Sequence, residues 1–346
     1  MASKQKASNY RNGRPTITSV EPCAAIVGGE IHIRGSHLAS NGRPTVRLGN
    51  QSAHLIVAGD SYIIARVPEA AMVGEIVVCS GDLESELGET HIGIQIADSL
   101  HPVANPAVDR EGNIYSTFSG SRGQKSPVSL YKIDTNYNSK PFVTDLMNPT
   151  GLTFDQEGIL YVSSRYDGIV YQINSGGNMS VYVEGMGVAT GIAFDREENL
   201  HVGDRSGTIF KISRSRQIYV FATLEPSIAA YHLAFGPDDD LYVSGPTTSS
   251  FDSIYRITKA GDVDTFFRGL GRPQGLAFDS EGRLYVAASL GGRRGIIRID
   301  RSQKPEQFLS GPGLVGLAFS PSRSIILASH NALFRVDADI AGWQLR

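Results

Sequence analysis

Short apolar segments that end in an aromatic residue and a polar one recur along the last two thirds of the chain. They end at positions 109, 155, 195, 236, 279 and 320, so successive copies lie 46, 40, 41, 43 and 41 residues apart. Typical copies read Gly151-Leu-Thr-Phe-Asp155, Gly191-Ile-Ala-Phe-Asp195 and Gly275-Leu-Ala-Phe-Asp279. Self-similarity at this period is the signature of a solenoid, a propeller or another repeat array.

Each copy continues with further short segments in which apolar and polar residues alternate. In the second copy these begin at Leu160 (Leu-Tyr-Val-Ser), Val170 (Val-Tyr-Gln-Ile) and Ser180 (Ser-Val-Tyr-Val). Alternation with a period of two indicates β-strands, and no copy shows the helical period. Four strands in each of six copies predict a six-bladed β-propeller over residues 98–346. The Asp that ends most first segments is interpreted as turn chemistry, because its carboxylate accepts hydrogen bonds from nearby backbone N–H groups.

Residues 15–97 show a different arrangement of strands separated by turn signals, with spacing typical of a sandwich. The expected strands are Thr16–Val20, Glu30–Arg34, Thr45–Leu48, 61–67, 75–79 and 91–97. The predicted fold class is therefore all-β: a six-bladed β-propeller preceded by a small immunoglobulin-like β-sandwich. Because 91–97 is assigned to the sandwich, the outer strand of the sixth blade is expected from 342–346, where Trp343 would be buried.

The rest of the composition excludes several classes of protein. Residues 1–14 are polar and basic, and are expected to form a disordered tail. A net charge of -3 gives no reason to expect nucleic acid as a partner. No run of 18 apolar residues predicts a membrane span, and without a signal peptide as written the default compartment is cytoplasmic. Cys23 and Cys79 are expected to be reduced and buried, since the sandwich order separates them.

The repeated motif resembles that of a known group of propellers. The pattern Gly-[Leu/Ile]-Ala-Phe-Asp followed by Gly-x-Leu-Tyr-Val is similar to NHL and gluconolactonase-like (senescence-marker-protein) propellers over about residues 100–346. This resemblance implies the architecture more strongly than an activity, because the group includes lactonases, lyases and binding modules. The segments Pro15 to Pro22 and Val27 to Leu38 resemble the opening of an IPT/TIG domain, which implies a spacer, dimerisation or recognition role without catalysis.

A binding site is expected at one face of the propeller, where three connections between second and third strands are long, at 119–127, 246–251 and 289–294. This face carries seven basic and three acidic residues, whereas the turns between first and second strands carry 12 acidic and 4 basic ones. The ligand is therefore expected to be anionic or polyhydroxylated, with Arg165 and Arg205 at equivalent positions. Register places these residues at the channel mouth: Asn105, Thr150, Arg165, Thr190, Asp204, Arg205, Tyr231, His232, Gln274 and His330.

Two functions remain open. The favoured one is a non-catalytic recognition propeller that binds such a ligand or a protein partner, with no cofactor, metal or catalytic residue. The alternative is a gluconolactonase-like hydrolase or a lyase that uses a His232/His330 acid–base pair or a divalent metal such as calcium. The resemblance implies a Glu ligand at the first inner-strand entrance, but the sequence there is His101-Pro-Val-Ala-Asn105, which leaves only Asn105 and Asp204 as ligands.

Overall fold

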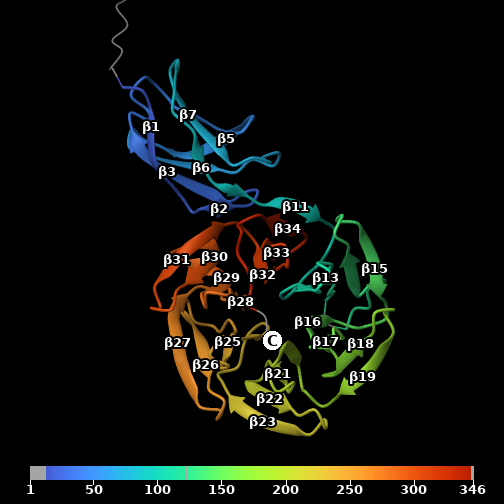
Figure 1. Cartoon of the computed structure of the whole chain (residues 1–346). Coiled ribbons are helices and arrows are strands. Elements are labelled where there is room, and N and C mark those ends of the chain that lie inside the picture. Colours follow the sequence, from blue (N-terminus) through green and yellow to red (C-terminus); the bar gives the residue numbers. More distant parts are fainter. Residues whose placement is uncertain (1–12, 122, 344–346) are drawn as a thin grey trace, which may run out of the picture. The chain divides into compact units, whose positions relative to one another are not determined.

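A computed structural model of the chain describes residues 13–121 and 123–343 (Figure 1). All regular structure in this part is β-strand, which confirms the all-β prediction. None of it forms a helix long and apolar enough to cross a membrane. The chain divides into two compact units, one of residues 13–93 with Leu309–Gly311 and one of Ile94–Phe308 with 312–343. Most of the expected basic tail lies outside the described residues.

The first unit is the predicted sandwich. Its main sheet runs β1-β3-β6-β5-β4-β7-β8, and β9 also pairs with β7. The short strands β2 and β10 are not part of this sheet and pair with each other in parallel. Its alternating strands bury Ile31, Ile33, Val46, Ile63 and Val78 in one core. The strands are β1 (Thr16–Glu21), β2 (Ala24–Ala25), β3 (Glu30–Ser36), β4 (Thr45–Leu48), β5 (Gln51–Ala58), β6 (Tyr62–Arg66), β7 (Glu75–Ser80), β8 (Leu83–Glu84), β9 (Gly88–Glu89) and β10 (His91–Ile92).

The second unit is a propeller of antiparallel sheets, in which each sequence repeat supplies one sheet in chain order. Figure 1 shows the sheets arranged around a central axis. The first three are β12 (Ala107–Val108), β13 (Ile114–Thr117), β14 (Leu130–Ile133) and β15 (Ser139–Val143); β16 (Pro149–Phe154), β17 (Leu160–Ser164), β18 (Val170–Ile173) and β19 (Met179–Val183); and β20 (Ala189–Phe194), β21 (Leu200–Asp204), β22 (Thr208–Ile212) and β23 (Ile218–Thr223).

The remaining repeats follow the same order from the inner to the outer strand. They form β24 (His232–Phe235), β25 (Leu241–Ser244), β26 (Asp252–Ile257) and β27 (Val263–Leu270); β28 (Leu276–Phe278), β29 (Leu284–Leu290), β30 (Arg293–Ile299) and β31 (Pro305–Ser310); and β32 (Leu314–Phe319), β33 (Ile325–Ser329) and β34 (Leu333–Val336). The last sheet is completed by β11 (Ile94–Ala97), which pairs antiparallel to β34.

This pairing corrects two sequence-based expectations. The segment 91–97 is not one sandwich strand, because it divides into β10 and β11 and only β10 belongs to the first unit. The outer strand of the last sheet is β11, so assigning that role to 342–346 is wrong. Gly342 instead bridges to Asp279, and the backbone N–H of Trp343 donates to the Phe278 carbonyl at 2.8 Å. Residues 344–346 lie outside the described part.

One aromatic contact repeats between neighbouring sheets. The second residue of the second strand is an aromatic ring that meets two other rings edge-on, one from the outer strand of its own sheet and one from the inner strand of the next. Its polar end reaches the acidic residue of the first turn, as in the Tyr242 hydroxyl donating to Asp238 at 2.7 Å. The residues at this position are Tyr115, Tyr161, His201, Tyr242 and Tyr285, and the last repeat has Ile326 instead.

The turn role of the repeated Asp is confirmed by its hydrogen bonds. The Asp155 carboxylate accepts the backbone N–H groups of Glu157 and Ile159 at 2.9 and 2.8 Å, and Asp279 does the same for Glu281 and Arg283 at 3.0 and 2.9 Å. These carboxylates therefore fix the turns remote from the channel mouth and hold the interlocking aromatic rings. In the repeat whose first segment ends at Gly236, Asp238 accepts the hydrogen bond from the tyrosine hydroxyl.

The cysteine expectation is correct in one respect and wrong in another. No disulfide joins Cys23 to Cys79, although both belong to the described part of the sandwich unit. Neither side chain is fully buried, because Cys23 is exposed and Cys79 is intermediate. Cys79 lies on β7 opposite Thr45 of β4, and its thiol donates to Glu84 at 3.6 Å.

Candidate functional site

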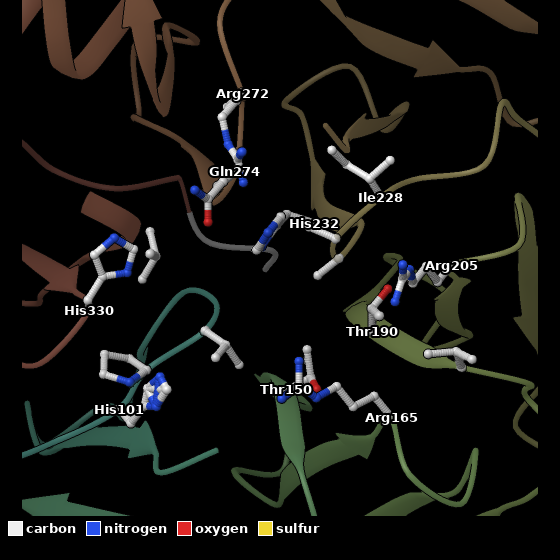
Figure 2. Close-up of a pocket in the computed structure, with 16 residues that line it drawn as sticks. His101, Thr150, Arg165, Thr190, Arg205, Ile228, His232, Arg272, Gln274 and His330 are labelled. Atoms are coloured by element: carbon white, nitrogen blue, oxygen red, sulfur yellow. The ribbon is translucent and has the colours of Figure 1, made fainter. Parts of the chain in front are cut away.

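A pocket of about 390 Å³ opens at the channel mouth of the propeller unit, where inner-strand entrances meet the ends of second strands (Figure 2). Its volume falls in the range of small-molecule sites. The lining combines cationic and hydrogen-bonding side chains with small apolar ones. It consists of His101, Pro102, Val103, Thr150, Arg165, Val188, Thr190, Arg205, Ile228, Ala229, Ala230, His232, Arg272, Gln274, Val315 and His330.

The structure brings seven of the ten sequence-predicted site residues to this pocket: Thr150, Arg165, Thr190, Arg205, His232, Gln274 and His330. They converge because equivalent positions of successive sheets meet around the propeller axis. Thr150 and Thr190 lie on inner strands at equivalent places, and both are almost fully buried. The Thr190 hydroxyl donates to Gly203 at 2.9 Å, and the Thr150 hydroxyl donates to Asn148 at 3.2 Å.

The other three predicted residues brace the backbone and do not line the pocket. The Asn105 amide donates to Leu276 at 2.9 Å, and its oxygen accepts the Leu317 N–H at 3.1 Å. Asp204 accepts the N–H of Val188 at 2.9 Å and the hydroxyl of Ser206. The buried Tyr231 hydroxyl donates to the Glu225 carbonyl. Assigning these three to the ligand set is not supported by their placement.

Arg165 and Arg205 are held in matching ways at the ends of β17 and β21. The backbone N–H of Arg165 donates to Asn148 and that of Arg205 donates to Val188, the equivalent residue of the next sheet. Each guanidinium then donates to one loop carbonyl, Arg165 to Gly120 at 2.9 Å and Arg205 to Ser227 at 3.1 Å. Both arginines also line the pocket, so each guanidinium is held from behind by a backbone carbonyl while its residue borders the cavity.

The three histidines of the pocket have different environments. His232 is fully buried, and this burial alone lowers the pKa of its imidazole to about 4. It is therefore neutral at physiological pH. His101 is exposed at the rim, beside Phe118 in an edge-on contact. Burial of part of the ring lowers the pKa of His101, and the positive charges of Arg165 and His330 lower it further.

Two polar residues of the pocket were missed by the sequence reasoning. In the sequence analysis His101 is considered only because a Glu ligand is missing from its segment. Arg272 is counted there only among the seven basic residues of the face with long loops. The sequence signal for Arg272 is its equivalence to Asn148. Arg272 stands two residues before the predicted site residue Gln274, and Asn148 stands two residues before the predicted site residue Thr150. With Arg272 included, three arginines line the pocket, and no carboxylate is among its described lining residues.

The residues do not fit the divalent metal of the gluconolactonase-like resemblance. Both candidate ligands, Asn105 and Asp204, use their side-chain oxygens to hold backbone N–H groups, and neither reaches the pocket. Within residues 13–121 and 123–343, no group of three or more His, Cys, Asp and Glu side chains is arranged to hold a metal ion. A hard cation requires several oxygen ligands, which this pocket does not offer.

The suggested His232/His330 acid–base pair gains no support from the charges around His232. Burial is the sole cause of the lowered pKa of His232, whereas His330 acts on the pKa of His101. Figure 2 likewise shows His101 and His330 on the same side of the pocket. His330 therefore lies on the side of His101.

Comparisons with known proteins agree with this architecture. The IPT/TIG domain family matches residues 15–86, so the first unit contains an IPT/TIG domain. No curated protein matches the chain.

Several solved structures share the fold at low sequence identity. A gluconolactonase from Xanthomonas campestris is 14% identical, with 71% of this chain and 89% of that one covered and a TM-score of 0.59. An auxiliary nutrient binding protein from Bacteroides thetaiotaomicron is 11% identical over 94% and 98% of the two chains, with a TM-score of 0.55. Catalytically inactive virginiamycin B lyase from Staphylococcus aureus with quinupristin is 15% identical over 96% and 98%, with a TM-score of 0.52. These likenesses concern the fold, and they are compatible with both binding and catalysis.

Proposed function

We propose that the chain is a recognition protein whose propeller binds a small anionic or polyhydroxylated ligand at the channel mouth, with the IPT/TIG domain as a spacer or interaction module. The propeller in this proposal is six-bladed and of the NHL or gluconolactonase-like type. The repeat period and the match between each repeat and one sheet support that assignment.

One observation carries the proposed ligand class: Arg165, Arg205 and Arg272 line a pocket in which no described lining residue is a carboxylate. Guanidinium groups bind carboxylate and phosphate through paired, charge-assisted hydrogen bonds. Gln274 adds a neutral polar group that suits hydroxyls, whereas the Thr150 and Thr190 hydroxyls already donate to backbone carbonyls. A lactone hydrolase or a lyase at the same mouth is the alternative, and turnover of a lactone or a cyclic ester distinguishes it from recognition.

The test is a screen of sugar acids, phosphates and simple carboxylates by isothermal titration calorimetry. For any anion that binds, Arg165→Ala/Arg205→Ala should weaken binding about 10- to 100-fold, as expected for losing two partly screened charge contacts. Wild-type affinity should also fall as salt is raised. Arg214→Ala is the matched control. Arg214 belongs to the same sheet as Arg205 but follows the end of β22, which lies at the opposite end of that sheet. Equally weak, salt-independent binding by wild type and double variant would refute an anion site.

Anion binding should also depend on pH through His101. Its pKa lies below the usual 6.5, so the side chain is mostly neutral at pH 7 and gains charge as the pH falls. A bound anion favours the charged form, so affinity for a sulfonate, which stays ionised, should rise about three- to tenfold from about pH 7.5 to about pH 5.5. His232 should not contribute, because its pKa is about 4. His101→Gln should make the rise smaller, and any rise that remains can be traced with His330→Gln, the other histidine on that side of the pocket. A rise of the same size in His101→Gln would exclude His101 as its source.

A further inference from the structure

Arg272 has a backbone conformation that arginine rarely adopts. Its φ is 47°, in the left-handed region, where the Cβ of most residues is crowded. It also precedes Pro273, which disfavours helical backbone conformations for the residue before it. A non-glycine residue in such a conformation persists where its surroundings hold it there, and these positions concentrate at functional sites.

The surroundings of Arg272 do hold it. On one side, Gly271 and Ser289 exchange backbone hydrogen bonds at 2.9 and 3.0 Å. On the other side, the N–H of Gln274 donates to Ala287 at 2.8 Å, and the N–H of Ala287 donates to Gly275 at 2.9 Å. Arg272 and Pro273 are therefore an outward bulge between two fixed points on β29. The bulge directs the Arg272 side chain into the pocket mouth (Figure 2).

The equivalent position three sheets away shows a structural use of this conformation. Asn148, also followed by proline, has a φ of 46°. Asparagine tolerates the left-handed region, and here its side chain braces a loop by donating to Gly120 and Ser121 and accepting from Gly123 at 2.7–3.0 Å. Arg272 is exposed, and its side chain makes no hydrogen bond or ion pair with the rest of the described chain. The strained position thus carries a cation without a structural partner.

Arg272 lines the pocket on a different side from the other two arginines. Figure 2 shows Arg272 and Gln274 entering from the top of the view, Arg165 from the lower right and Arg205 from the right. We propose that Arg272 binds a second acidic group, so that the ligand is a compact molecule with an acidic group at each end, of the dicarboxylate class. This inference rests on the proposed function, in which Arg165 and Arg205 hold the first acidic group. Once one acidic group is bound, binding of the second is intramolecular and loses little further translational and rotational entropy. The affinity for a ligand with two acidic groups should therefore exceed that for a ligand with one.

The experiment compares aliphatic dicarboxylates of graded length with their half-amides, which keep length and shape but lose one charge. For wild type, the best dicarboxylate should bind at least about tenfold more tightly than its half-amide. Arg272→Asn should reduce dicarboxylate binding to about the level of the half-amide, and it should weaken half-amide binding by a clearly smaller factor, because one carboxylate can be held by Arg165 and Arg205. Arg272→Lys, which keeps the charge, should retain part of the preference.

Arg272→Asn also has a readout that separates binding from folding. It places at position 272 the residue found at the equivalent position 148, so the variant should melt at the same temperature as wild type or higher, while dicarboxylate binding falls. If half-amides and dicarboxylates bind wild type equally, or Arg272→Asn leaves the preference intact, the second acidic group is refuted while the anion site of Arg165 and Arg205 stands. If neither compound binds wild type, both proposals fail.

Discussion

A propeller fragment that begins at Ile94 should melt at least about 10 °C above one that begins at Asp98, because only the first retains β11. In the intact chain Ile94, Gln95 and Ala97 pair with residues of β34, and Ile96 packs against the cluster that contains Ile133 and Leu333. Several ladder hydrogen bonds at about 1 kcal/mol each and two partly buried isoleucines at about 1 kcal/mol each sum to about 5 kcal/mol. At about 2–4 °C for each kcal/mol in a unit of this size, the difference in Tm is about 10–20 °C.

The measurement is differential scanning calorimetry or circular dichroism of residues 94–346 and 98–346 at equal concentration. The shorter fragment also exposes the edge of β34, so it should aggregate more readily on heating. Removing 342–346 from the longer fragment is the matched comparison, since those residues were the sequence-based candidate for the same role. Gly342 and Trp343 make one bridge to Asp279 and one backbone hydrogen bond to Phe278. The Trp343 ring also packs at the edge of one apolar cluster, 5.6 Å from the Arg196 guanidinium. Because two residues make fewer ladder hydrogen bonds than a paired strand, their loss should lower Tm by less than the loss of β11. Equal melting of the two fragments would contradict ring closure by β11.

The closing strand illustrates what the sequence could not provide. Residues 91–97 alternate in the manner of any half-buried strand, and nothing local distinguishes a last sandwich strand from an outer propeller strand. The partner of β11 is β34, more than 230 residues away in the sequence. The repeat could be predicted, in contrast, because the same inner-strand pattern recurs six times and each copy confirms the others. Register within a repeat also placed Arg165 and Arg205 correctly at one face.

Side-chain direction at the channel mouth was only partly predictable. Asn105, Asp204 and Tyr231 have the right register, but their side chains satisfy nearby backbone groups and turn away from the pocket. A buried backbone N–H requires a partner, and the sequence does not show which polar side chain supplies it. Arg272 was overlooked as a site residue for the opposite reason: its direction depends on a bulge fixed by hydrogen bonds to β29. Proline at 273 indicates an irregular backbone, but it does not show that the φ of the residue before it is positive.

Tyr285→Ala should destabilise the propeller by about 3–5 kcal/mol and lower Tm by about 6–20 °C, the cost of removing a large buried aromatic side chain. Tyr285 is 0% exposed, and its ring centroid lies 5.1 Å from that of Phe308 and 5.3 Å from that of Phe319. Phe308 belongs to its own sheet and Phe319 to the next, so the ring fills the space between two sheets. Burial also raises the pKa of its hydroxyl to about 12, which keeps it a hydrogen-bond donor to Asp279 at ordinary pH.

Two further variants separate the ring from the hydroxyl. Tyr285→Phe keeps both edge-on contacts and loses one hydrogen bond, so it should cost only about 1 kcal/mol. The third repeat supports this division, because His201 occupies the equivalent position, meets Phe221 and Phe235 edge-on and pairs with Asp195 at 3.2 Å. The first five repeats therefore have in common an aromatic ring with a polar end, and not tyrosine as such. Tyr219→Ala, at a side chain that is 51% exposed on β23, is the control and should change stability by less than about 0.5 kcal/mol. A Tyr285→Ala variant as stable as this control would show that the interlocking rings do not hold neighbouring sheets together.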